Sequence, residues 1–236
     1  MTERDVRHEN VDTIGLISDV HANYPALRAV LDEMPPVDAL VCAGDVIGYN
    51  AMPVECLETV RDHCEYVVQG NHDRTVETPE AYSFNRMAYE GLKLARERLS
   101  AEQIAWLSSR PERLKLFDGR LLLVHSHPEN RDEYVYEDDF PSVATYMASE
   151  TSVLALGHTH EQGAVDMSRF DRHGYVVNPG SVGQPRDGDP RAAYAVVNLN
   201  APTVDLHRVA YPTEEIVRAN EQAGLPQRTS ERLWQD

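Results

Sequence analysis

Lysine is nearly missing from this 236-residue chain. Lys93 and Lys115 are its only lysines, and the remaining basic residues are arginines. Acidic residues are abundant, because 39 Asp and Glu against 22 Lys and Arg give a formal net charge of −17. A surface with this charge repels the phosphates of a nucleic acid over any large footprint. The composition therefore argues against an extended DNA or RNA interface.

The same composition has two interpretations. An acidic, lysine-poor chain is typical of proteins from organisms that accumulate salt, where the Debye length falls to about 3 Å at 1 M and self-repulsion is screened. The alternative is simply an acidic mesophilic protein. We favour the halophilic interpretation, on composition alone.

Cysteines and long apolar runs are also scarce. Cys42, Cys56 and Cys64 form a sparse and odd-numbered set, and we expect them to be small buried side chains in a reducing cytoplasm. No run of 18 apolar residues is present, so we expect no membrane-spanning helix. The N-terminal stretch MTERDVRHENVD is charged and has no apolar core. It predicts no secretory signal, and we expect a cytoplasmic protein without membrane contact.

Apolar runs alternate with amphipathic segments in the first two thirds of the chain. The apolar runs predict strands at 13–18, 38–44, 65–70, 120–126 and 152–157. Apolar residues at helical spacing predict helices at 23–33, 52–64 and about 139–149, and one or two helices within 83–109. Farther on, GAVDMSRF, GYVVNPG, AAYAVVNL and TVDLHRV read as short strands joined by turns, followed by a helix at about 212–223 and a polar tail.

This order of elements indicates the fold class. A βαβ-type first half is followed by a strand-rich second half, without an internal repeat, a low-complexity segment or a long linker. We therefore expect one compact α/β domain that spans residues 1–236.

Side chains that bind metals follow five of the predicted strands, directly after each strand ends. They are Asp19 and His21, then Asp45, then Asn71, His72 and Asp73, then His125 and His127, and finally His158 and His160. In an α/β sheet the carboxyl ends of the strands share one edge, where ligands bind. Histidine and aspartate without cysteine suit divalent Mn, Fe, Co, Ni or Zn. The pattern predicts a metal centre.

The spacing of two motifs adds a geometric expectation. DVH (19–21) and HTH (158–160) each place two candidate ligands at positions i and i+2. Alternate side chains of an extended segment point the same way. Each pair could therefore converge on one ion.

Each motif also has an ordinary structural explanation when it is considered alone. Asp19 could cap the helix that follows it, GHTH could be a polar turn, and HSHP could be a turn before Pro128. Asn71 and Asp73 both tolerate the backbone of a turn. The occurrence of all five motifs on successive strand ends favours the metal centre.

The order of the motifs resembles that of the calcineurin-like metallophosphoesterases. The matching elements are Asp19-x-His21, Gly44-Asp45, Gly70-Asn71-His72-Asp73, His125 and Gly157-His158-x-His160. Farther along, NPGSVGQPRDGDPRAAYAVV (178–197) and AGLP (223–226) are similar to the small bacterial and archaeal branch that has no cap domain. The resemblance implies a four-layer αββα sandwich with two mixed sheets and a dinuclear metal site at the strand ends.

The resemblance also implies a role for each matching residue. It assigns Asp19, His21 and His160 to the first metal, Asn71, His125 and His158 to the second, and Asp45 to both as a bridge. His72 matches a histidine that approaches the phosphate without binding metal, and Asp73 is expected to orient it. Both are therefore expected to be catalytic residues. The family implies two divalent ions, and we expect manganese ahead of iron, nickel, cobalt or zinc.

Some positions depart from the family pattern or stay open. His127, in HSHP, competes with His125 for the metal, and we favour His125 because it directly follows the apolar run. Asn50 matches a position that lines the mouth of the site in relatives. Tyr49, Arg74 and Arg186 are either contacts to phosphate or base, or plain surface residues.

The function implied is that of a metal-dependent phosphoesterase that acts on a small phosphoester. In this family a hydroxide that bridges the two metals attacks phosphorus in line. We expect phosphodiesters to be preferred over monoesters, because of the resemblance to the uncapped branch. The rival interpretation is a non-catalytic metal-binding scaffold of the same fold, which is disfavoured because His72 and all seven implied ligands are present. The sequence carries no signal for an oligomeric state.

We expect the stability of the fold to depend on salt. The charge of −17 with two lysines should cause self-repulsion that loosens the fold at low ionic strength. Thermal melts from low to molar KCl should therefore show a rising melting temperature. A melting temperature independent of salt would refute the halophilic interpretation and leave the enzymatic one untouched.

Overall fold

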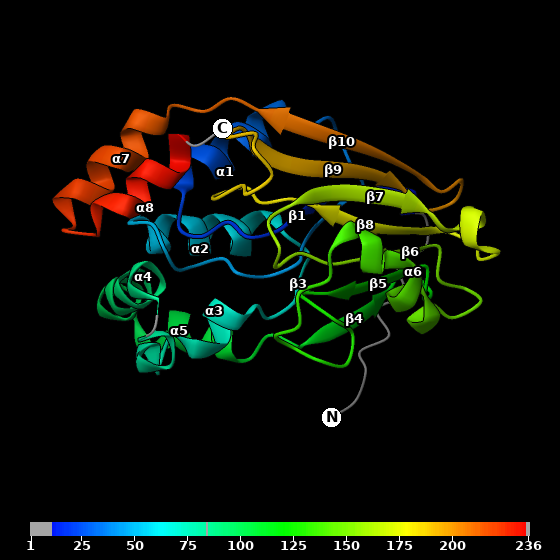
Figure 1. Ribbon diagram of the computed structural model, residues 1–236, viewed down its shortest axis with the longest axis horizontal. Coiled ribbons are helices and arrows are strands. Elements are labelled where there is room, and N and C mark those ends of the chain that lie inside the picture. The colour runs from blue at the N-terminus through cyan, green and yellow to red at the C-terminus, as the bar shows by residue number, and fades with distance from the viewer. Residues whose placement is uncertain (1–10, 84, 235–236) are drawn as a thin grey trace.

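The computed structural model describes residues 11–83 and 85–234. These residues contain two five-stranded sheets, with the strand orders β10-β9-β1-β2-β3 and β4-β5-β6-β8-β7 (Figure 1). The strands of the first sheet are β1 (Thr13–Ile17), β2 (Ala39–Cys42), β3 (Tyr66–Val67), β9 (Ala192–Asn198) and β10 (Thr203–Val209). Those of the second are β4 (Arg113–Leu116), β5 (Leu121–Val124), β6 (Val153–Ala155), β7 (Gln162–Asp166) and β8 (Tyr175–Pro179).

Both sheets are mixed. Strands β1, β2 and β3 are parallel, and β9 and β10 complete their sheet in antiparallel fashion. Strands β5, β6 and β8 are parallel, with antiparallel β4 and β7 at the two edges. The sequences of β2 (ALVC) and β5 (LLLV) are buried at every position, as expected for strands covered on both faces. The expectation of an α/β fold with two mixed sheets is confirmed.

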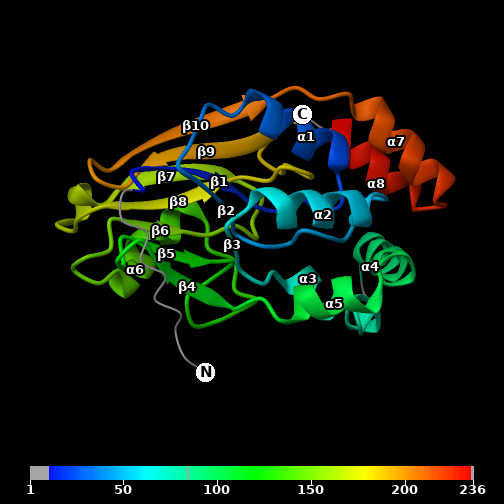
Figure 2. The same cartoon turned by 180° about the vertical axis from the view of Figure 1, so that it is seen from behind.

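Helices cover the outer faces of the two sheets, and the inner faces share a core. Leu16 and Val41 of the first sheet belong to the same apolar cluster as Leu123, Ala155 and Val177 of the second. The outer face of the first sheet packs against α1 (Tyr24–Glu33), α2 (Pro53–His63), α4 (Arg86–Arg98) and α5 (Ala101–Ser108). The second sheet is covered by α6 (Phe140–Val143) and the 3-10 turn after it, Ala144–Tyr146 (Figure 2). Burial of these faces supplies the hydrophobic stabilisation of the sandwich.

Helix ends follow local sequence signals. Asn23 accepts a hydrogen bond from the backbone N–H of Ala26 and caps α1, which also has a proline in its first turn. Ser100 and Gln103 form a capping box at the start of α5. These caps explain why the predicted helices at 23–33 and 83–109 begin or break where they do.

Some elements differ from the sequence expectations. The helix expected at about 139–149 is only α6 and one 3-10 turn, so it ends at Tyr146. The polar tail after α7 (Thr213–Gln222) is helical instead, with α8 (Gln227–Glu231) and the 3-10 turn Arg232–Trp234. A short helix, α3 (Asn71–Thr75), and the edge strand β4 were not expected.

The other composition-based expectations concern cysteines and membranes. Cys42 and Cys56 are buried thiols, and Cys64 is half-buried. Within residues 11–83 and 85–234, no helix has both the length and the apolar character that a bilayer crossing requires.

Gly91 marks a close contact between α4 and the loop that holds Tyr49. A Cβ at this buried position would lie 2.3 Å from the backbone nitrogen of Tyr49 and 2.6 Å from its Cα. The neighbouring atoms are backbone, which cannot move aside like a flexible side chain. The absence of a side chain at Gly91 therefore permits the helix to approach the loop.

We expect Gly91→Ala to destabilise the fold by about 1–3 kcal/mol, the usual cost of overpacking. This is the reverse of the ordinary helix preference, in which alanine is favoured over glycine by about 1 kcal/mol. Chemical denaturation of the two proteins measures the difference. Glu97→Ala, on the exposed face of the same helix, is the matched control and should stay within about 0.5 kcal/mol of the parent. An increase in stability for Gly91→Ala would contradict the contact.

Candidate metal centre

The candidate ligands come from both sheets. Asp19 and His21 follow β1, Asp45 follows β2 and Asn71 opens α3 just after β3. His125 follows β5, and the GHTH segment (157–160) follows β6, so these residues belong to the second sheet. The expectation of a single shared sheet edge is therefore too simple. The carboxyl ends of the parallel strands of two packed sheets meet at this site.

The first cluster contains Asp19, His21 and His160, all three buried. The Nε2 atoms of His21 and His160 lie 3.1 Å apart. Asp19 Oδ1 is 3.6 Å from Nε2 of His21 and 3.3 Å from Nε2 of His160. Three donor atoms therefore converge on a single point.

The second cluster contains Asp45, His125 and His158, and Asn71 adjoins it. His125 Nε2 lies 3.4 Å from Asp45 Oδ2 and 3.0 Å from Asn71 Oδ1. The same Asp45 oxygen is 3.7 Å from His21 Nε2 in the first cluster. The Asp45 carboxylate thus lies between the two clusters and contacts both.

The outer ring nitrogens fix the direction of three imidazoles. Their Nδ1 atoms lie at hydrogen-bond distance from backbone carbonyl oxygens: His21 from Ile47 at 3.0 Å, His125 from Ala43 at 2.7 Å and His160 from Gln184 at 2.6 Å. A carbonyl only accepts, so each Nδ1 carries a proton and each Nε2 points toward the cluster, with a lone pair whenever the ring is neutral. Two lone pairs that face each other at 3.1 Å repel unless a cation lies near them. This arrangement fits a metal.

Two buried donor atoms support the same fit. Among the described residues, Asp19 Oδ1 and His158 Nε2 are buried without a hydrogen-bond partner. The other carboxylate oxygen of Asp19 accepts from the Ser18 hydroxyl at 2.7 Å and from the backbone N–H of His158 at 3.0 Å. Buried polar atoms without partners are costly in a folded protein, and metal coordination satisfies them. A set of nitrogen and oxygen donors without sulfur suits divalent ions such as Mn, Fe, Co, Ni or Zn.

The ionisation of the clusters also suits metal ligands. Burial opposes ionisation of Asp19 and Asp45, yet the nearby histidines hold the pKa of each carboxyl below its ordinary value. Burial and the neighbouring His125 lower the pKa of His158 to about 4. His125 differs, because the Asp45 carboxylate overcomes its burial and raises its pKa to about 10. Ionised carboxylates beside a neutral imidazole are the protonation states that ligate metals.

The backbone is strained at most of the ligand positions. The residues with φ in the left-handed region are Asp19 (52°), His21 (46°), Asp45 (53°), His158 (70°) and His160 (63°). This conformation costs of order 1–3 kcal/mol for a residue with a Cβ and persists only where the surroundings enforce it. Such a concentration of strain in one place is characteristic of functional sites.

This strain overturns the expectation drawn from the i, i+2 spacing. Neither DVH nor HTH is extended, because their ligand residues all have positive φ. Asp19 and His21 still meet in the first cluster. His158 and His160 do not, since His160 joins the first cluster and His158 the second. The HTH pair therefore reaches both clusters instead of one.

His72 and Asp73 lie in the first turn of α3, next to Asn71. His72 is buried, falls within the cluster range of His21 and Asp45, and has no hydrogen-bond partner at Nδ1. The hydrogen bonds of the Asp73 carboxylate go to backbone N–H groups: those of Asp45 (2.9 Å), Val46 (3.0 Å), Ile47 (3.4 Å) and Gly70 (3.1 Å). These bonds hold the loop that contains Asp45, so the structure makes Asp73 a positioning residue for that loop.

Gly70 permits this loop to approach α3. A Cβ at Gly70 would fall 2.0 Å from Asp45 Oδ1 and 2.3 Å from the Asp45 backbone nitrogen. Only a residue without a side chain fits there. The GNHD motif thus places the glycine, the ligand and the positioning carboxylate next to one another in sequence.

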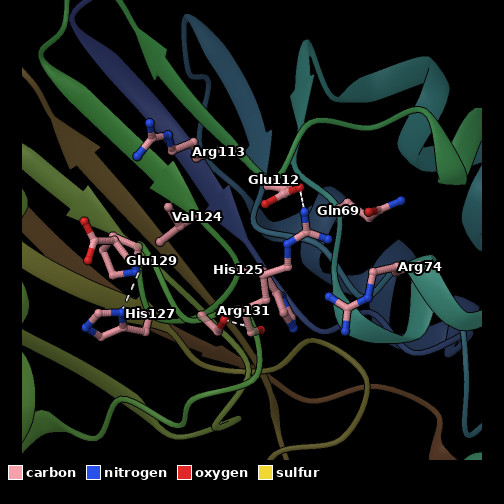
Figure 3. Close-up of a pocket in the computed structure, with 11 residues that line it drawn as sticks. Gln69, Arg74, Glu112, Arg113, Val124, His125, His127, Glu129 and Arg131 are labelled. Atoms are coloured by element: carbon pink, nitrogen blue, oxygen red, sulfur yellow. Dashed lines mark hydrogen bonds and ion pairs between the residues drawn. The ribbon is translucent and has the colours of Figure 1, made fainter. Parts of the chain in front are cut away.

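The structure distinguishes His127 from His125. The Nδ1 atom of His127 accepts from the backbone N–H groups of Glu129 and Asn130, each at 3.2 Å, and its ring meets Tyr146 edge-on. Figure 3 shows His127 beside Glu129 and apart from His125. In the described part of the chain, His125 and not His127 joins the metal-binding clusters.

Asn50 does not line the mouth of the site. It is fully buried, and its amide donates to the backbone oxygen of His21 at 2.9 Å. Its carbonyl oxygen accepts from the amide of Asn220 in α7 at 3.0 Å. Asn50 therefore connects the backbone of a candidate ligand to the C-terminal helices.

A pocket of about 440 Å³ opens onto the two clusters. Tyr49, Arg74 and Arg186 all line it, together with His72 and His158. Arg186 donates to the hydroxyl of Tyr49 at 3.2 Å, whereas Arg74 pairs with Asp132 at 2.8 Å. A neighbouring hollow of about 530 Å³ shares Arg74 with this pocket and is lined by His125 (Figure 3).

Sequence reasoning missed two tyrosines at the site. Tyr134 is 48% exposed, lines the pocket and stacks on His158, with the ring centroids 4.3 Å apart. Tyr82 accepts a hydrogen bond from the amide of Asn71, which leaves the Asn71 carbonyl oxygen for the cluster. Neither tyrosine follows a predicted strand, so no sequence signal marked them.

Comparisons with known sequences and structures indicate the family of this chain. The sequence model of the calcineurin-like phosphoesterase superfamily domain matches residues 13–201. The uncharacterized protein MJ0912 of Methanocaldococcus jannaschii is 30% identical over 244 residues, covering 94% of this chain and 97% of that protein. In structure, a metallophosphoesterase from Sphaerobacter thermophilus matches with a TM-score of 0.78 and 35% identity, over 95% of this chain and 98% of that one.

A second solved structure is similar in fold. The hypothetical protein PH1004 from Pyrococcus horikoshii matches with a TM-score of 0.80 and 19% identity, over 94% of this chain and 98% of that one. The family match covers most of the chain and includes every residue of both clusters. This protein belongs to the calcineurin-like phosphoesterase superfamily, whose enzymes hydrolyse phosphoric esters with the help of metal ions.

Proposed function

We propose that this chain, as a single domain, is a hydrolase of small phosphodiesters that works with two divalent metal ions, manganese foremost. The single observation that carries the proposal is the pair of buried Asp/His clusters bridged by Asp45. Asp19, His21 and His160 would hold the first ion, and Asn71, His125 and His158 the second. When bound, two such ions supply positive charge to the phosphoryl oxygens and lower the pKa of a water toward about 7.

The other residues of the pocket act on the substrate. Arg186 lies in the pocket with a guanidinium that suits two oxygens of a phosphoryl group. His72 lies at the same pocket, where burial lowers its pKa to about 3 despite the nearby Asp45 carboxylate. A neutral His72 donates a hydrogen bond from a ring N–H to the phosphate. The negative charge of the phosphate raises the pKa of His72. His72 is then placed to protonate the oxygen that leaves.

The preference for diesters is supported by the space around the clusters. A phosphodiester places an organic group on each side of phosphorus. Arg74 lines both the pocket of about 440 Å³ and the neighbouring hollow of about 530 Å³. His158 borders the first space, and His125 borders the second. Tyr134 supplies an exposed aromatic face in the first of them. Two adjoining spaces fit an ester with two substituents.

The rival function is a metal-binding scaffold without catalysis. The strained backbone and the complete set of candidate ligands favour the enzyme, because strain of this kind has no evident use in a passive surface. Metal analysis separates the two proposals cheaply.

We expect the protein to take up about two ions for each chain after it is reconstituted with Mn²⁺, as the two clusters require. Metal analysis by mass spectrometry measures the uptake, and chelation should abolish activity. A panel of chromogenic monoesters and diesters tests the substrate class on the same preparation. Well under one ion for each chain would favour the scaffold, and cleavage of monoesters alone would refute the diester preference.

Asn71→Ala and His72→Ala should differ although the residues are adjacent. Asn71→Ala removes an oxygen ligand, so metal content and activity should fall together, and excess Mn²⁺ should restore part of the rate. His72→Ala should keep both ions and lose activity by a factor of about 10²–10⁴, the usual contribution of a positioned acid or base. This loss corresponds to about 3–5 kcal/mol of barrier.

The leaving group gives the control for His72. The loss of activity in His72→Ala should shrink for esters whose leaving groups are acidic, because these need little protonation. Metal content and rate have to be measured on one preparation. A His72→Ala protein that lacks an ion would make His72 a ligand, and normal rates toward a poor leaving group would remove it from the reaction.

A further inference from the structure

A third hollow, distinct from the catalytic pocket and from the space beside it, is lined by residues at the start of α4 and in and around α8. These two helices lie at the same end of the molecule (Figures 1 and 2). Its volume is about 770 Å³, and its lining includes Asn85, Arg86, Pro226, Arg228 and Arg232. Three guanidinium groups therefore line one space, and none of the described residues that line it is acidic. In a chain with 39 acidic residues and a net charge of −17, a cationic pocket of this kind requires an explanation.

Most other arginines of the described chain have a partner. Ion pairs with carboxylates hold Arg28, Arg61, Arg74, Arg131, Arg191 and Arg208. Side-chain hydrogen bonds hold Arg98, Arg110, Arg120, Arg186 and Arg218, whereas Arg96, Arg113, Arg169 and Arg172 have neither kind of partner among the described residues. Arg86, Arg228 and Arg232 have no ion pair and no side-chain hydrogen bond among residues 11–83 and 85–234. Like charges brought together without counter-charges repel one another, and an anion between them removes the repulsion.

The hollow adjoins the catalytic pocket. Asn85 lines both spaces. Arg232 lies on the wall of the hollow, and its pKa is lowered first by burial and then by the positive charge of Arg186 in the catalytic pocket. The Nε atom of Arg186 is itself buried and has no hydrogen-bond partner in the described chain. A continuous row of positive charge thus leads from the metal centre toward α8.

The helices that bear these arginines are fixed to the metal centre. The amide of Asn220 in α7 donates to Asn50, and the amide of Asn50 donates to the backbone oxygen of His21. Asn220 also contacts the hydroxyl of Ser230 in α8, at 3.5 Å. A chain of buried amides therefore sets the distance between a candidate metal ligand and the arginines at 228 and 232. The AGLP segment (223–226) forms the turn that brings α8 to this position.

We propose that this arginine-lined hollow binds a second phosphate group of the substrate, while the first is hydrolysed at the metal centre. The inference rests on the proposed function and narrows the substrate to a phosphoester that carries another phosphoryl group. Guanidinium groups bind phosphate oxygens through two parallel hydrogen bonds, so arginines suit this ligand. The second phosphate does not react. Its binding energy holds the substrate in place and orients the phosphate that is hydrolysed.

Equilibrium binding without metal tests the hollow by itself. The probe is inorganic pyrophosphate, titrated into EDTA-treated protein at 0.15 M salt and followed by calorimetry. We expect the double variant Arg228→Gln/Arg232→Gln to bind about tenfold more weakly or worse, since a hydrogen bond to a charged group commonly contributes that much. The control is Arg169→Gln/Arg172→Gln, which makes the same change of charge at exposed positions and should bind like the parent.

Equal binding by the parent and the 228/232 variant would overturn the proposal, as would equal weakening by the control. Arg86→Gln provides an independent single variant at an exposed position, and it should weaken binding in the same direction. Unchanged melting temperatures verify that the variants are folded.

Kinetics with the Mn²⁺-loaded protein separate the two proposals. The substrates are 4-nitrophenyl thymidine 5′-phosphate and the same diester with an added 3′-phosphate. We expect the parent to prefer the phosphorylated ester in kcat/KM, and the 228/232 variant to lose about tenfold on that ester through KM and almost nothing on the other. If the parent cleaves neither ester, the proposed function fails, while the metal-free titration still decides the hollow. If both esters are cleaved and the variant loses equally on each, the hollow is not a subsite.

Discussion

The Asp45 carboxylate connects the parts of this site that the chain brings from separate places. One of its oxygens faces His21 at 3.7 Å and His125 at 3.4 Å, so it lies between ligands that follow strands of different sheets. Its other oxygen accepts from the backbone N–H of His72 at 2.8 Å. A buried carboxylate in contact with several donors needs compensating positive charge. Metal ions bound here would provide it, and the ligands, the α3 turn and the two sheets would then depend on the same charge.

The strained loops can exist because other residues hold them. The Asp73 carboxylate accepts hydrogen bonds from the backbone N–H groups of Asp45, Val46 and Gly70. On the opposite side, the Ser181 hydroxyl donates to the backbone oxygen of Asp19 at 2.7 Å, and the Asn178 amide donates to that of Gly157 at 3.0 Å. These bonds are independent of metal, so they offset part of the strain before an ion binds. The NPGS segment therefore preorganises the ligands, which lowers the cost of assembling the centre.

An element of this fold could be predicted only where its own stretch of sequence has a clear pattern. Fully buried strands such as β2 and β5 are recognisable as apolar runs, and the candidate ligands are recognisable because they follow such runs. The edge strand β4, RLKL, alternates charged and apolar residues over only four positions, which is too short to identify. Helix α8 is polar and short, and it is stabilised by buried contacts such as that between Asn220 and Ser230. Asn220 and Ser230 are 10 residues apart, so a short window of sequence does not show that they are in contact.

The geometry of the ligands was less predictable than their identity. The family resemblance assigned His158 and His160 to different metals, but the i, i+2 spacing did not predict their separation. It depends on positive φ at both residues, and nothing in the letters HTH specifies that backbone. It is imposed by contacts from distant segments, such as the hydrogen bond between the His158 N–H and Asp19. The same reason explains the mistaken placement of Asn50, whose partners are Asn220 and the backbone of His21. Long-range hydrogen bonds determine the site, whereas local pattern determines the elements that carry it.

Electrostatics pose the remaining question, because a chain with a net charge of −17 proposed to act on phosphates repels them at a distance. At physiological ionic strength the Debye length is about 8 Å, so carboxylates farther away are largely screened. The charges that a bound phosphate encounters are then those within a few ångströms, and around the pocket these include the Arg74 and Arg186 guanidinium groups. Arg74 is neutralised by Asp132, whereas Arg186 is held by the neutral Tyr49 and Gln184. On this argument net charge would govern solubility and salt response, while arginines without a carboxylate partner would govern the binding of phosphate. An acidic surface and a phosphate site are compatible in one molecule for this reason.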